Sequence, residues 1–189
     1  MKLALRLAVL VSAFVVCRHA ALWAQADEGT LSEREVDSLR DAAYMPVESM
    51  IAYEKILDTR ERQIEDLLAK RNYPGREKDV HDLIDQMASI ADELNDHLDK
   101  YSAQHRDVRK ELPKLVKATE RWSTALRAPP DDAAYKVVRR IALDSVKDTR
   151  DVAEQMEMEL DKYFAEHPDA AKAEKERAKH PHDPYATPE

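Results

Sequence analysis

Between Val80 and Leu126 apolar side chains recur at alternating steps of four and three residues. This spacing of 3.5 residues is typical of a helix that buries one seam in a bundle. Because the phase passes through Pro113 without slipping, we predict a single long helix over 77–127 with a kink at that proline. The seam positions are Val80, Ile84, Met87, Ala91, Leu94, Leu98, Tyr101, His105, Val108, Leu112, Leu115, Thr119, Trp122 and Leu126.

Two further helical regions flank the long one. The first spans 31–71 and ends at the turn sequence Asn72-Tyr73-Pro74-Gly75. Pro46 interrupts it, so the part before Met45 is expected to be a separate short helix. The third region spans 131–167, after Pro129 and Pro130. Its predicted seam is Ala142, Val146, Thr149, Ala153, Met156, Leu160 and Tyr163.

These patterns predict an all-α fold. The chain has only two glycines, Gly29 and Gly75, which leaves little turn chemistry for β-hairpins or phosphate-binding loops. Short turns between long helices favour an elongated antiparallel three-helix bundle of coiled-coil type, or a four-helix one if the short N-terminal helix joins it. We predict one domain over 27–167. Residues 168–189 have four prolines, many charges and no apolar period, so we predict a disordered charged tail there.

The N-terminus has the pattern of an export signal. Lys2 and Arg6 precede an apolar run over 7–17, and a small-x-small cleavage site follows at 24–26. We therefore predict a signal peptide over 1–26, cleavage near Ala26 and a periplasmic or secreted mature chain. Its only cysteine, Cys17, would leave with the signal, so the mature chain can form no disulfide and no cysteine metal site.

Charge is distributed unevenly. The net charge of the chain is −8, yet residues 106–140 carry ten Lys or Arg against five acids. This segment includes the predicted connection between the second and third helices. We therefore predict a basic end on the bundle. It could meet a partner protein, the acidic part of a second copy or an anionic membrane surface. Nucleic acid is excluded as a partner because the exported chain is acidic overall. The candidate surface residues are Arg109, Lys110, Lys114, Lys117 and Arg121.

A Tyr-x-x-x-His pattern occurs twice, at Tyr101/His105 and at Tyr163/His167, within two similar segments 62 residues apart. One interpretation is that two helices meet the same packing demands. The other is a helix-hairpin duplication. Antiparallel folding would place Tyr44, Tyr101, His105 and Met156 in one layer. Imidazole and thioether groups suit copper or haem, so His105 and Met156 are candidate metal ligands. The simpler interpretation is a core histidine bonded to tyrosine.

No residue pattern predicts catalysis. There is no Gly-rich nucleophile elbow, phosphate loop or haem-attachment motif, and no cofactor is expected. We predict a non-enzymatic, exported helical bundle that serves as an interaction or structural module of the cell envelope. The alternative is a periplasmic ligand, metal or haem carrier that uses the Tyr/His/Met layer.

The start of the predicted mature domain, LSEREVDSLRDA at 31–42, resembles the opening of a group of uncharacterised bacterial exported all-helical proteins. These share an LSExEVDxLRDA-like start followed by long charged helices. The resemblance implies a helical exported protein and implies no activity. Small exported stress chaperones share LTxxQ motifs instead, which this chain lacks.

Overall fold

The computed structural model describes residues 30–179, and every regular element in that range is a helix. The all-α prediction is therefore confirmed. The predicted signal peptide lies outside the described residues, as do residues 180–189. The helices are α2 (Glu33–Ala42), α3 (Pro46–Ala69), α4 (Arg76–Ala103), α5 (Leu112–Arg127), α6 (Lys136–Glu166) and α7 (Pro168–Lys179).

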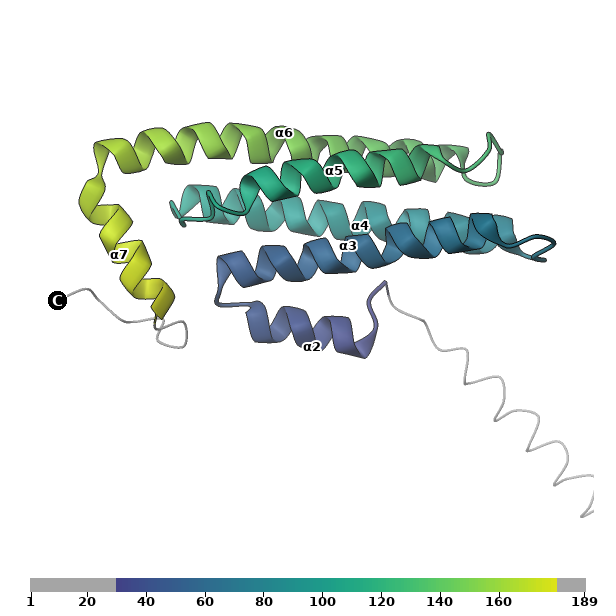
Figure 1. Ribbon diagram of the computed structural model, residues 1–189, viewed down its shortest axis with the longest axis horizontal. Coiled ribbons are helices and arrows are strands. Elements are labelled where there is room, and N and C mark those ends of the chain that lie inside the picture. The colour runs from purple at the N-terminus through teal and green to yellow at the C-terminus, as the bar shows by residue number, and fades with distance from the viewer. Residues whose placement is uncertain (1–29, 180–189) are drawn as a thin grey trace, which may run out of the picture. The chain divides into compact units, whose positions relative to one another are not determined.

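The four long helices α3 to α6 run antiparallel in chain order, and their connections alternate between the two ends of the bundle (Figure 1). Helix α4 packs against α3 and α6, and α5 packs against the same two helices. The pair α4 and α5 is not among the well-packed pairs. Consecutive helices α4 and α5 therefore occupy diagonally opposite corners of the bundle, with α3 and α6 at the other two.

The apolar seam read from the sequence forms the core. All its positions from Val80 to Leu126 are buried except His105, which is exposed. On α6 the predicted seam is buried from Ala142 to Leu160, whereas Tyr163 is half-buried and Phe164 is buried next to it. The pattern thus identified the buried faces of three helices.

The prediction of one helix over 77–127 is wrong, because the chain reverses at residues 104–111. His105 adopts a left-handed conformation, φ +50°, directly after α4. Its N–H donates to the Ser102 carbonyl, and the Arg106 N–H donates to the Tyr101 carbonyl at 2.9 Å. These two bonds form a Schellman motif, the usual C-terminal stop of a helix. Pro113 lies in the first turn of α5, where its missing N–H costs nothing.

The first helical region divides as Pro46 indicated. That proline begins α3, and α2 is a separate helix that packs on α3. The turn predicted at 72–75 is also present, with Gly75 in a left-handed conformation, φ +85°, before α4. A glycine at this position avoids the steric cost that a Cβ would bring.

A buried ion pair fastens α2 to the bundle. Arg60 of α3 donates from Nη1 and Nη2 to the two carboxylate oxygens of Glu35 at 2.7 and 2.8 Å. Its Nε donates to Gln86 of α4 at 2.7 Å. The Arg60 side chain is 7% exposed and that of Glu35 is 17% exposed. A bidentate pair of this kind fixes orientation as well as position.

The predicted disordered tail is wrong for its first part, because Pro168–Lys179 forms helix α7. Three of the four prolines of the tail lie beyond Lys179, and the fourth begins the helix. Residues 169–179, between the first and second prolines of the tail, are rich in alanine, lysine and glutamate, which are strong helix formers. Arg106, in the α4–α5 connection, pairs with Glu174 of α7 at 3.0 Å. Across residues 30–179, no helix is both long and apolar enough to span a membrane.

Candidate interaction surfaces

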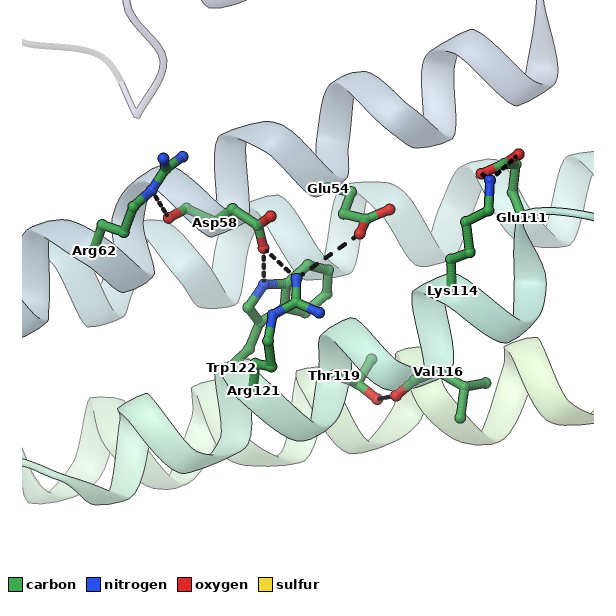
Figure 2. A network of polar contacts seen from close by, with 9 residues as sticks. All are labelled: Glu54, Asp58, Arg62, Glu111, Lys114, Val116, Thr119, Arg121 and Trp122. Atoms are coloured by element: carbon green, nitrogen blue, oxygen red, sulfur yellow. Dashed lines mark hydrogen bonds and ion pairs between the residues drawn. The ribbon is translucent and has the colours of Figure 1, made fainter.

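A polar network joins α3 to α5 (Figure 2). The Trp122 Nε1–H donates to Asp58 Oδ1 at 2.8 Å, and Arg121 Nη2 donates to the same oxygen at 2.9 Å. Arg121 also lies 3.9 Å from Glu54. Burial, and then the charge of Asp58, raise the pKa of Glu54, while Arg121 opposes that rise. The arginine thus neutralises carboxylates of α3 within the bundle.

Most of the predicted basic surface is neutralised in this way. Arg109 pairs with Asp107 at 2.8 Å and with Asp161 at 3.1 Å, and Lys114 pairs with Glu111 at 2.8 Å. Lys110 and Lys117 are exposed, and no ion pair to either is found within residues 30–179. The predicted basic end is also wrong: residues 106–140 include both ends of α5, so their cations follow the length of the bundle.

The two Tyr-x-x-x-His segments meet at one end of the bundle. The His105 ring stacks on the Tyr163 ring with centroids 3.8 Å apart, and the His167 ring stacks on Tyr163 at 4.5 Å. The Arg109 guanidinium lies over the neighbouring Phe164 ring at 4.5 Å. This cluster joins the α4–α5 connection to the end of α6, which gives the histidines a packing role.

The four residues of the predicted Tyr/His/Met layer differ in exposure. Tyr44 is 67% exposed and His105 is exposed, whereas Met156 is 2% exposed inside the bundle. No hydrogen bond or ring contact joins any two of Tyr44, Tyr101, His105 and Met156. In the part of the chain that the structure describes, no group of three or more His, Cys, Asp or Glu is arranged to hold a metal ion.

A second cluster lies between α3 and α4. The Tyr53 hydroxyl donates to Glu93 at 2.8 Å, and the His97 ring lies between those of Tyr53 and Tyr101, at 5.3 and 5.8 Å. Burial, and then the positive charge of Lys100, lower the pKa of His97. The His97 imidazole is therefore harder to protonate in the folded protein than in the unfolded chain.

The solvent face of α4 carries a group of acids that was not among the predicted site residues. Residues 79–99 contain seven acids and neither Lys nor Arg. Five of these acids are exposed, and four of the five lie within about 60° of one another around the helix, at 100° per residue. We call them the acidic line: Asp85, Asp92, Asp96 and Asp99. None of the four forms an ion pair within residues 30–179.

The absence of Lys and Arg over 79–99 is readable in the sequence, but the net charge of a long segment does not reveal it, because that sum does not separate one helix face from another. Comparisons with known proteins add no assignment: no family model, no curated protein and no solved structure matches this chain.

Proposed function

We propose that this protein is an exported, non-enzymatic helical bundle that serves as an interaction or structural module of the cell envelope. The acidic line carries the proposal. Elsewhere on the bundle, several charged side chains pair across elements, as Asp58 of α3 does with Arg121 of α5, and Arg109 of the α4–α5 connection with Asp161 of α6. On α4 the four acids of the acidic line form no ion pair within residues 30–179, which favours a positively charged partner.

Two further observations support an interaction role. The N-terminal pattern of Lys2, Arg6 and the apolar run supports export. The 3.5-residue repeat supports coiled-coil-type packing, which leaves one face of each helix free for partners. The alternative, a metal or haem carrier, would need the Tyr/His/Met layer, and His105 instead packs on Tyr163.

Native mass spectrometry on the protein purified from its own envelope fraction tests the proposal. We expect a chain that begins at Asp27, carries no metal or organic cofactor and is seen partly with a second protein chain. A bound cofactor mass that disappears in His105→Ala, and persists in the control His81→Ala, would contradict the proposal and favour a carrier. A chain that retains residues 1–26 would contradict export.

A further inference from the structure

The bundle presents opposite charges at opposite corners. The acidic line follows the solvent face of α4 over about 21 Å, from Asp85 to Asp99. A second line of exposed cations, which we call the basic line, begins just before α5 and continues along it: Lys110, Lys114, Lys117 and Arg121. Since α4 and α5 each pack on both α3 and α6, the helices that carry the two lines lie at opposite corners of the bundle.

The two lines repeat at the same interval. Asp92, Asp96 and Asp99 follow steps of four and three residues. The basic line follows steps of four, three and four from Lys110 to Arg121. Two helices laid side by side can therefore bring each acid against a cation over about two turns, as the charged flanks of coiled coils do. One acid, Glu120, lies beside the basic line, and it pairs with Arg150 of α6 at 3.7 Å.

Two of the four cations of the basic line remain available to a partner. Lys110 and Lys117 have no ion pair among the described residues. Lys114 and Arg121 do pair with acids, but their side chains are 63% and 47% exposed. Their partners Glu111 and Asp58 are only 12% and 29% exposed, so Lys110 and Lys117 are the cations that a partner can reach most directly.

We infer that the acidic line of one copy docks along the basic line of a second copy, so that bundles associate side by side. The inference rests on the proposed interaction role and names its partner. Each copy carries both lines on opposite corners, so the contact is heterologous and can repeat from copy to copy. Such a contact is held mainly by exposed charges, and it is therefore weak and sensitive to salt.

Sedimentation velocity on the processed protein over a range of concentrations tests the inference. At about 0.1 M salt, where the Debye length is about 10 Å, contacts between the lines persist and repulsion between distant acids is screened. We expect the average mass to rise with protein concentration. At about 1 M salt, where the Debye length is about 3 Å, we expect monomer.

Two charge-reversal variants make the test specific. Lys110→Glu/Lys117→Glu and Asp92→Lys/Asp96→Lys each place like charges on both corners, and each alone is expected to associate at least about tenfold more weakly. An equimolar mixture of the two restores complementary corners and is expected to associate again. Recovery on mixing also shows that both variants are folded.

Matched controls carry the same changes of charge elsewhere. Lys136→Glu/Arg140→Glu and Asp144→Lys/Asp148→Lys alter exposed residues of α6, and the second pair has the spacing of Asp92 and Asp96. We expect them to associate as the wild type does. A wild type that stays monomeric at about 0.1 M salt, controls that disrupt association equally, or a mixture that does not associate would each overturn the inference. These results would leave the interaction role standing if the envelope preparation still shows a different protein chain.

Discussion

His105 occupies a backbone conformation that usually belongs to glycine. Its φ of +50° places the Cβ against the following carbonyl, which costs a non-glycine residue about 1–2 kcal/mol. The sequence pattern gave no warning, because a histidine at this position does not signal a helix end. The stacking of its ring on Tyr163 offsets part of the cost.

Two substitutions separate these contributions. His105→Ala and His105→Gly both remove the ring, but only glycine relieves the left-handed conformation. We expect the glycine variant to be more stable than the alanine variant by about 1 kcal/mol in urea unfolding. Equal stabilities would show that the chain reversal at 104–111 does not depend on a left-handed residue.

His97 is expected to make the stability of the bundle depend on pH. Its pKa is lowered in the folded protein from the ordinary histidine value of about 6.5, first by burial and then by the charge of Lys100. As pH falls through 6.5, the unfolded chain binds a proton that the folded chain resists. The free energy of unfolding therefore decreases on acidification until pH reaches the lowered pKa.

The measurement compares wild type with His97→Gln in urea unfolding between about pH 7.5 and about pH 5. We expect the wild type to lose more stability than the variant over this range, because glutamine has no proton to bind. Parallel losses in the two proteins would show that His97 is not the responsible group.

At the scale of elements, α2 depends on one ion pair more than on apolar burial. Ala42 is its only buried residue, and α3 is the helix on which it packs. Glu35 meets the buried guanidinium of Arg60 with both carboxylate oxygens. Breaking such a pair leaves a buried charge without its partner, at a cost of about 3–5 kcal/mol.

Glu35→Ala is expected to release α2. Hydrogen exchange should increase across 33–42 while the amides of the buried part of α4 stay protected. Asp37→Ala is the matched control. Both side chains of the Asp37–Arg40 pair are exposed, so the pair contributes less than about 1 kcal/mol to stability. Unchanged exchange in Glu35→Ala would show that apolar contacts alone hold α2.

The connections between elements differed in how far the sequence revealed them. Pro46 and the sequence around Gly75 marked helix ends correctly, because proline and glycine restrict the backbone locally. The predicted kink at Pro113 is wrong. Pro113 lies in the first turn of α5, and that position depends on the chain reversal that precedes it. The repeat could not reveal the reversal, because the connection happens to preserve the heptad phase of α4 and α5.

At the scale of the whole molecule, the reversal at 104–111 changes both topology and charge. An unbroken helix would have placed the cations of 106–140 around one end. The reversal instead lays α5 along the bundle at the corner opposite α4. In this arrangement Arg109 and Arg121 form ion pairs with acids of the same bundle. It also places the acidic line and the basic line on different helices.

The sequence by itself determined that the described chain is helical, which faces are buried and where two of the helix ends lie. These properties depend on the spacing of apolar side chains and on the backbone limits of proline and glycine, both of which are local. Only the tertiary structure decided that four long helices replace three, that His105 stacks on Tyr163, and that opposite charges occupy opposite corners. Those outcomes depend on contacts between residues that are far apart in the sequence, and no local pattern in this chain predicts these contacts.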